Sequence, residues 1–371
     1  MESLALAPTP APAVRGATVV RTSLREALAL GPAAWDSLLA VSAAASPFSG
    51  WAWHHAWAAS APAADVAASE ALLQRGADGA LQAILPLSLR RVQWRRVTVP
   101  ALTWSAGDTG CPDHLDFLAA PGADMAALAC ALEGLPWQVA ILGNVSDPAP
   151  NVDRVCDLLA QRGHTVRRAA LWPCPWLELP DSWDTYLGSL SATRRQTVRR
   201  KERGLCRDHA ATLTDYTDRV AEGWGHLVRL HEQRWNGAGA FREPQLERLQ
   251  LCFAEEMARR GRLWLTTLDL DGQPAAAWYG FSSPDTVYFY QSGRAPQWED
   301  ASVGLVLMGM MIRRAIERGY KRFDFLRGAD AYKSDWTGAQ RMTREIVVFR
   351  AGWRSGWVRA LDWVAERRRH A

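Results

Sequence analysis

An acidic residue in the last fifth of the chain is the first candidate for chemistry. Asp324 lies in the segment Arg-Phe-Asp-Phe-Leu-Arg-Gly, between Phe323 and Phe325. If this segment is a strand, both rings share one face and the carboxylate points to the other. A carboxylate that lines a cleft acts as general base for an attacking amine or hydroxyl. The alternative is a structural carboxylate that pairs with Arg327 or accepts backbone N–H bonds.

An arginine beside a tryptophan is the second candidate. Arg234 and Trp235 stand at the expected end of a helix and precede the sequence Asn-Gly-Ala-Gly. A guanidinium and an indole together suit a planar, anionic or sugar-like ligand. Both are therefore candidate substrate-binding residues. The alternative is that Arg234 caps the helix and Trp235 packs in the core.

A strongly basic segment, residues 194–203, is the third candidate. Helical spacing places Arg195, Arg199 and Arg203 on one face. Such a face suits tRNA, the 3′-phosphate of coenzyme A or a phosphorylated substrate, so Arg195 and Arg199 are candidate substrate-binding residues. The alternative is a solvated, charged helix face, which is the usual explanation of such a run.

Motifs and composition argue against several other classes. The sequence contains no H-E-x-x-H, Walker loop, G-x-G-x-x-G or Ser-His-Asp series, and its six cysteines form no C-x-x-C pair. We therefore expect no metal site. A net charge of +4 over 371 residues argues against a DNA-binding protein. Apolar residues at 48% and charged residues at 22% are typical of a globular protein.

The N-terminus and the apolar runs bear on location. Residues 1–17 are rich in Ala and Pro and lack a basic n-region, which predicts a flexible tail rather than a signal peptide. The apolar run from Val303 to Ile312 is far shorter than the ~20 residues that span a bilayer. Scattered cysteines suit a reducing compartment. We therefore expect a cytoplasmic protein without a membrane span.

Hydrophobic periodicity predicts the elements that must position these residues. The length predicts two domains. In the first half we expect strands and helices in mixed order, with a basic turn or hairpin at 90–96. The Pro/Trp-rich segment LWPCPWLELP disfavours helix and marks a junction. We therefore place a first lobe at 18–170 and a second at 171–371.

The second half has the clearer pattern. We expect helices at 183–190, 192–203, 222–235, 244–260 and 302–318, and strands at 262–270, 275–281, 286–291, 321–326 and 345–350. Gly204 is expected to end the basic helix, and Asp271-Gly272 predicts a tight hairpin. A basic amphipathic helix is expected to end the chain. Antiparallel strands followed by a helix and a further strand make an α+β order.

Four segments of the second half together resemble a known family. They are YLGSLSATRRQTVRRKERGL (186–205), HEQRWNGAGAF (231–241), GRLWLTTLDLDGQPAAAWYGF (261–281) and SVGLVLMGMMIRRAIERGYKRFDFLRGADAYKSDW (302–336). Their order and spacing resemble the acetyltransferase domain of CelD-like and BioF-associated proteins, a GNAT-superfamily branch related to FemABX aminoacyltransferases. FSGWAWHHAWAAS and LPLSLRR extend the likeness to the first half. The resemblance implies two GNAT-like lobes, each a mixed, mostly antiparallel sheet flanked by helices.

The resemblance also implies a donor site at the 302–318 helix. In GNAT folds the start of this helix offers backbone N–H groups and its positive end to the pyrophosphate of acyl-CoA. Ser302, Val303 and Gly304 would supply these donors, and Arg294 would add charge. The usual Arg/Gln-x-x-Gly-x-Gly/Ala loop is present only as the fragments Gln-Ser-Gly-Arg and Ser-Val-Gly. FemABX relatives also lack that loop and take an aminoacyl-tRNA instead.

Two further residues gain roles from the resemblance. Tyr332 and Lys333 match a recurring Tyr-Lys pair of the family. Tyr332 would protonate a leaving thiolate. Lys333 would hold a phosphate, a substrate carboxylate or the developing oxyanion.

The expected function is therefore acyl transfer without a metal. The donor would be acetyl-CoA or another acyl-CoA, and the acceptor an amine or hydroxyl of a small molecule or of a cell-envelope or polysaccharide precursor. One alternative is a FemABX-like transferase that binds aminoacyl-tRNA. Another is a non-catalytic GNAT-fold scaffold in envelope or polysaccharide synthesis.

Overall fold

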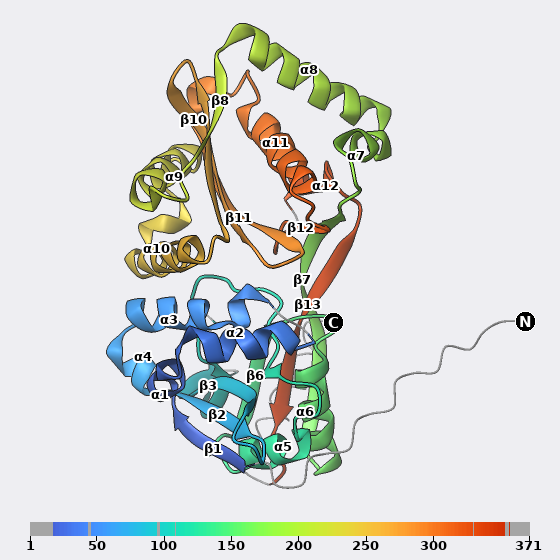
Figure 1. Cartoon of the computed structure of the whole chain (residues 1–371). Coiled ribbons are helices and arrows are strands. Elements are labelled where there is room, and N and C mark those ends of the chain that lie inside the picture. The colour runs from blue at the N-terminus through green and yellow to red at the C-terminus, as the bar shows by residue number, and fades with distance from the viewer. Residues whose placement is uncertain are drawn as a thin grey trace, which may run out of the picture. The chain divides into compact units, whose positions relative to one another are not determined.

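The computed structural model describes residues 18–352 except 44–45, 95–96, 108 and 329, together with Gly356. The chain forms two compact units (Figure 1). Unit 1 contains residues up to 54, residues 62–171 and residues from 344 onward, and unit 2 contains residues 55–61 and 172–343. The sequence pattern predicted one continuous second lobe from 171 to 371, whereas residues 344–352 group with unit 1. The expected tail and C-terminal helix lie outside the described residues.

Unit 1 is built around a sheet with the order β1-β2-β3-β4-β6-β13. Its strands are β1 (Thr18–Ser23), β2 (Ser69–Arg75), β3 (Leu81–Trp94), β4 (Val97–Trp104), β5 (Leu118–Ala119), β6 (Val139–Val145), the start of β7 (Thr165–Glu178) and the end of β13 (Gln340–Phe349). Its helices are α1 (Leu24–Ala29), α2 (Gly31–Val41), α4 (Ala63–Ala67), α5 (Met125–Glu133) and α6 (Pro150–Gln161), with α3 (Trp51–Ser60) divided between the units. Among the described strand pairs of unit 1, only β4 and β6 pair in parallel.

Unit 2 has a sheet with the order β7-β12-β11-β10-β9-β8. Its further strands are β8 (Ala211–Asp215), β9 (Leu263–Leu270), β10 (Gln273–Ser282), β11 (Thr286–Arg294) and β12 (Arg322–Asp324). Its helices are α7 (Trp183–Ser189), α8 (Ala192–Asp208), α9 (Val220–Arg234), α10 (Pro244–Arg259), α11 (Val303–Glu317) and α12 (Ala331–Ser334). Figure 1 shows α9 and α10 on one face of this sheet and α7, α8 and α11 on the other.

The two units share one plan. In each, an antiparallel run of strands is followed by a helix and then by a strand that pairs in parallel with the last strand of the run. The parallel pairs are β4 with β6 in unit 1 and β11 with β12 in unit 2. The predicted α+β class, with two lobes of mixed, mostly antiparallel sheet flanked by helices, is confirmed.

Local sequence explains most of unit 2. Asp271 and Gly272 have φ of 52° and 81°, as a tight hairpin between β9 and β10 requires. Helix α11 packs on the sheet through a buried apolar face, with Val306, Met311 and Ile312 in the same core as Trp278. These apolar residues recur at helical spacing, which is why the helix was predictable.

One local prediction is wrong. Gly204 does not end the basic helix, because α8 continues to Asp208. The buried side chains of Val198 and Leu205 hold the helix on the core of unit 2, and this outweighs the ~1 kcal/mol cost of an interior glycine. The basic segment after Leu89 belongs to the expected hairpin, because β3 runs on to Trp94 and pairs there in antiparallel register with Val97 of β4.

Candidate active site

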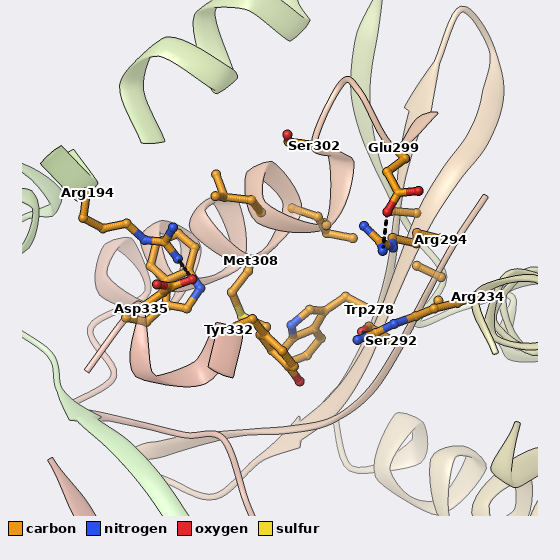
Figure 2. Close-up of a pocket in the computed structure, with 17 residues that line it drawn as sticks. Arg194, Arg234, Trp278, Ser292, Arg294, Glu299, Ser302, Met308, Tyr332 and Asp335 are labelled. Carbon is orange, nitrogen blue, oxygen red and sulfur yellow. Dashed lines mark hydrogen bonds and ion pairs between the residues drawn. The ribbon is translucent and has the colours of Figure 1, made fainter. Parts of the chain in front are cut away.

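A cavity of about 430 Å³ lies in unit 2 beside the first turn of α11. Figure 2 shows side chains from β10, β11, α11 and α12 converging on it. The residues that line it are Arg194, Arg234, Ala276, Ala277, Trp278, Ser292, Gly293, Arg294, Glu299, Ser302, Gly304, Leu305, Leu307, Met308, Tyr332, Asp335 and Trp336. Of the sequence candidates, the cavity brings together Arg234, Arg294, Ser302, Gly304 and Tyr332.

The cavity opens where two strands separate. β12 pairs with β11 only over Thr286–Tyr288, while β11 continues on β10 as far as Arg294. The pairing of β10 with β11 shifts register between Tyr279 and Gly280, which leaves Tyr290 as an extra residue in β11. A bulge of this kind re-aims the residues that follow it. The last three residues of β11 thus become one wall of the cavity.

A buried histidine holds that wall against α9. The backbone N–H of Ala240 donates to Nε2 of His231 at 3.1 Å, so Nδ1 carries the hydrogen and donates to the carbonyl of Ser292 at 3.1 Å. Burial lowers the pKa of His231, which keeps the imidazole neutral. Gly293 lies so close to α9 that a Cβ there would collide with the backbone of Leu230 and His231. The backbones of α9 and β11 therefore lie in close contact at this wall.

Arg234 enters the cavity from the end of α9. Its Nη1 donates to Oγ of Ser292 at 2.8 Å. Its guanidinium lies 5.2 Å from the ring centroid of Trp235 and 5.7 Å from that of Tyr332. Trp235 itself is 46% exposed and does not line the cavity. Of the Arg-Trp pair, only the arginine is therefore placed to meet a ligand in the cavity.

Tyr332 lies opposite Arg234 on α12. Burial is the main cause that raises the pKa of its hydroxyl, to about 12; the charge of Asp330 adds to this effect and Arg234 opposes it. The hydroxyl is therefore protonated at neutral pH and able to donate a proton. Figure 2 shows its ring beside Trp278 and Met308, at the centre of the cavity.

The start of α11 forms the other end of the cavity. Ser302 precedes the helix with a left-handed φ of 57°, and no side chain among the described residues caps it. The first N–H groups of a helix lack intrahelical acceptors, so that of Gly304, which lines the cavity, is available to an anion. Val303 is fully buried and outside the lining, whereas Gly304 is exposed. Arg294 stands nearby and pairs with Glu299 at 3.0 Å.

An ion pair that the sequence analysis missed separates this cavity from a second one. Arg194 pairs with Asp335 at 2.5 Å and lies 5.3 Å from the ring centroid of Trp336. These three residues also line a neighbouring cavity of about 640 Å³, between α7, the start of α8 and residues 334–339. Arg194 belongs to the basic segment 194–203, but helical spacing selected the face that contains Arg195 and not Arg194. Asp335 and Trp336 end the last family-like segment (302–336), and this position is the sequence feature that could have indicated them.

Asp324 does not line either cavity. Its carboxylate is buried, pairs with the guanidinium of Arg341 and accepts the N–H of Leu326 at 2.7 Å. Leu326 has a left-handed φ of 54°, so this hydrogen bond holds the turn that follows β12. The arrangement corresponds to the structural alternative for Asp324, with Arg341 rather than Arg327 as the charged partner. Asp324, the candidate base, thus lies outside the two cavities in which a base would have to reach the acceptor.

Lys333 is also directed away from the cavity. Its side chain is buried, and its Nζ donates to the carbonyl of Arg327 at 2.6 Å and lies 3.5 Å from the carboxylate of Asp330. It therefore holds the loop that carries Tyr332.

The two arginines chosen from the basic run lie outside both cavities. Arg195 donates to the carbonyl of Gly188 at 3.1 Å, and Arg199 lies 3.5 Å from Asp184 on the surface of α8.

One donor in the cavity has no partner. The indole of Trp278 is almost fully buried and lines the cavity, yet its Nε1–H has no hydrogen-bond acceptor among the described residues. A buried N–H without an acceptor costs about 1–3 kcal/mol. A ligand oxygen in the cavity would remove that cost. Beyond its place in a family-like segment, no sequence pattern singled out this residue.

In the part of the chain that the structure describes, no three or more His, Cys, Asp or Glu side chains are grouped so as to hold a metal ion. No helix among these residues has the length and apolar composition needed to cross a membrane.

One family model matches part of the chain. Residues 192–334 match the model described as the acetyltransferase (GNAT) domain. This segment contains most of the cavity-lining residues, including Arg194, Arg234 and Tyr332. No curated protein matches the chain in sequence.

Solved structures are similar to the chain over most of its length. A conserved protein of unknown function from Bacteroides thetaiotaomicron has a TM-score of 0.56 at 11% identity, over 86% of this chain and 98% of that one. The C-terminal domain of a putative lysylphosphatidylglycerol synthetase from Agrobacterium fabrum has a TM-score of 0.53 at 12% identity, over 88% and 92%. The structure of L-PGS from Bacillus licheniformis gives 0.52 at 11%, over 86% and 92%. At these identities the similarity shows the fold alone.

Proposed function

We propose that unit 2 transfers an acyl group from acyl-CoA to an amine or hydroxyl of a small molecule, or of a cell-envelope or polysaccharide precursor. The observation that carries this proposal is the cavity of the GNAT-type segment, which joins an uncapped helix start to a protonated tyrosine. An acyl donor with a phosphate at one end and a thioester at the other needs both features.

The donor would lie with its diphosphate at the first turn of α11. The N–H group of Gly304 and the positive end of a 15-residue helix favour an anion there. Gly304 leaves room, since a Cβ would meet only the side chain of Arg294, at 3.8 Å. Arg294 adds a positive charge at this end of the cavity. Its side chain is 38% exposed and pairs with Glu299. These residues fit a phosphate group without rearrangement of the helix.

Tyr332 would act as the acid. When the acceptor attacks the thioester carbon, the new bond to nitrogen or oxygen forms and the carbon–sulfur bond breaks. The sulfur takes the hydroxyl proton of Tyr332, and the proton released by the acceptor restores the tyrosine. The indole N–H of Trp278 is the candidate donor to the carbonyl oxygen, where negative charge develops.

Acceptor deprotonation would need no carboxylate base. The two carboxylates that line the cavity, Glu299 and Asp335, are both paired with arginines. An amine acceptor would therefore bind in its neutral form, after it loses a proton to solvent. Turnover should then rise with pH up to the pKa of the amine, without a falling limb below about pH 10, because Tyr332 remains protonated there.

Tyr332→Phe tests the proposal. We expect kcat for thiol release from acetyl-CoA to fall by about 100-fold, the usual contribution of a positioned acid. The Kd for CoA, measured by calorimetry, should change by less than about threefold, since the hydroxyl is not part of the phosphate site. If the phenylalanine variant keeps its kcat, the tyrosine is not the acid.

A transferase that takes aminoacyl-tRNA is the second candidate. The observation that favours it is the exposed basic face of α8, where Arg199, Arg200 and Arg203 are all solvent-exposed. Titration with acetyl-CoA and with aminoacyl-tRNA separates the two. Binding of tRNA that is lost in the double variant Arg195→Glu and Arg199→Glu would favour the tRNA donor. If neither donor binds at millimolar concentration, a scaffold without catalysis replaces both.

A further inference from the structure

The charges that line the cavity do not balance. Three arginines and two carboxylates line it. Asp335 pairs with Arg194 at 2.5 Å, and Glu299 pairs with Arg294 at 3.0 Å. Arg234 is therefore the lining cation that has no carboxylate partner among the described residues. A partly buried charge without a counter-ion is unfavourable, and a ligand anion would remove that cost.

Acidic residues on the neighbouring elements serve other groups. Asp330, which precedes α12, lies 3.5 Å from Nζ of Lys333. Glu232, on the same helix as Arg234, lies beside Gly239 and acts electrostatically on His231. Neither carboxylate forms an ion pair with Arg234.

The Arg234 guanidinium is already held in position. Ser292 accepts one N–H bond at 2.8 Å, and the aromatic rings of Trp235 and Tyr332 lie at 5.2 and 5.7 Å. An arginine has five N–H donors in a planar fork, so donors remain for a second partner. A fork that is fixed before binding loses little freedom when it binds a planar anion. Its neighbour Tyr332 is the proposed acid, so this anion would lie beside the reacting carbonyl.

We infer that Arg234 binds a carboxylate carried by one of the two substrates. The inference rests on the proposed acyl transfer and narrows its substrate class. The carboxylate belongs either to an acceptor of the α-amino acid type or to a dicarboxylic acyl group. Both present the same planar anion, which a guanidinium binds through two parallel hydrogen bonds.

Matched substrate pairs test the inference in the full-length protein. L-serine against ethanolamine and L-lysine against cadaverine differ by one carboxylate on the acceptor. Succinyl-CoA against butyryl-CoA differ by one carboxylate on the acyl group. The readout is kcat/KM for thiol release, together with the Kd of each donor and acceptor by calorimetry. We expect one class of pair to favour the carboxylate member by about 10- to 100-fold, the range of a charge-assisted hydrogen bond.

Two variants test whether Arg234 causes the preference for the carboxylate-bearing substrate. Arg234→Met should abolish the preference, by weakening turnover of the carboxylate member at least about 10-fold more than turnover of its carboxylate-free partner. Arg234→Lys should keep part of it, since the charge remains and the fork is lost. Arg229→Met is the matched control, because Arg229 is an exposed residue of the same helix outside the cavity. It should leave the preference unchanged.

The outcomes separate this inference from the proposed function. If Arg234→Met slows both members of every pair equally, Arg234 stabilises charge in the transition state and the inference is wrong. If the wild type turns over but prefers no carboxylate, the inference fails and the acyl transfer stands. If CoA does not bind, the acyl-CoA proposal fails. Calorimetry with L-lysine and cadaverine then still decides whether Arg234 binds a carboxylate.

Discussion

Replacement of Gly304 by glutamate tests whether the first turn of α11 holds the diphosphate of the donor. The position tolerates a side chain, because it is exposed and a Cβ would meet only Cδ of Arg294, at an ordinary contact distance of 3.8 Å. Gly304→Ala is therefore a matched control that adds a side chain without charge. It should raise the free energy of unfolding by about 0.5–1 kcal/mol, since it removes a glycine from a helix.

The charge of the glutamate has opposite effects on folding and binding. At the start of a helix a carboxylate stabilises the fold by about 0.3–1 kcal/mol. Beside a bound phosphate it is repelled: two unit charges about 6 Å apart interact by about 3 kcal/mol at an effective dielectric constant of about 20. Relative to Gly304→Ala, the Kd for CoA should therefore rise by about 100-fold while the protein remains at least as stable. Misfolding would instead lower both the affinity for CoA and the stability of the protein.

Calorimetric titration with CoA, beside urea unfolding of both variants, provides the measurement. The penalty should shrink in about 0.5 M NaCl, because salt screens exposed charges. If Gly304→Glu binds CoA within about threefold of Gly304→Ala, the diphosphate does not lie at this helix and the proposed donor site is wrong.

Three further predictions concern the groups that hold the cavity. Gly293→Ala should lower the stability of the protein by about 2–4 kcal/mol in urea unfolding, because the new Cβ meets the backbone of Leu230 and His231, which cannot move aside; unchanged stability would show that helix and strand can separate. Asp324→Asn should lower the stability of the protein by about 3 kcal/mol, because it leaves Arg341 unpaired. At a temperature where the variant is folded, kcat should stay within about fivefold of the wild type. A loss of kcat beyond about 100-fold in the folded variant would identify Asp324 as the base. Burial lowers the pKa of His231 in the folded protein, so its contribution to stability is present above the unfolded value of about 6.5 and is lost as pH falls through the lower folded value. His231→Gln should remove this part of the pH dependence of urea unfolding below about pH 6.5, and an unchanged profile would contradict it.

Several features of unit 2 were predictable because they depend on neighbours in sequence. The Asp271-Gly272 turn is specified by two residues that adopt positive φ. The α11 helix follows from apolar residues at helical spacing, and its bounds agree with the prediction within one residue at each end. The order of strands and helices then follows from the order of these patterns. These are properties of a few consecutive side chains, so they can be read without a fold.

The partners of the charged groups could not be predicted in this way. Asp324 pairs with Arg341, 17 residues later, because the chain turns back after β12. Arg194 reaches Asp335 across 141 positions, and their ion pair closes one wall of the cavity. Helical spacing alone selected Arg195 and Arg199, since it reports which residues share a face and not what that face meets.

The sequence by itself determined the class of fold, the helix that begins at the cavity and the segment that carries Tyr332. Only the tertiary structure decided which candidates meet there. It brought Arg234 and Tyr332 together, and it placed Asp324 and Lys333 with other partners. The physical reason is that local conformation depends on backbone preferences and spacing, whereas the use of a charged side chain depends on the counter-charge that the folded chain brings within reach.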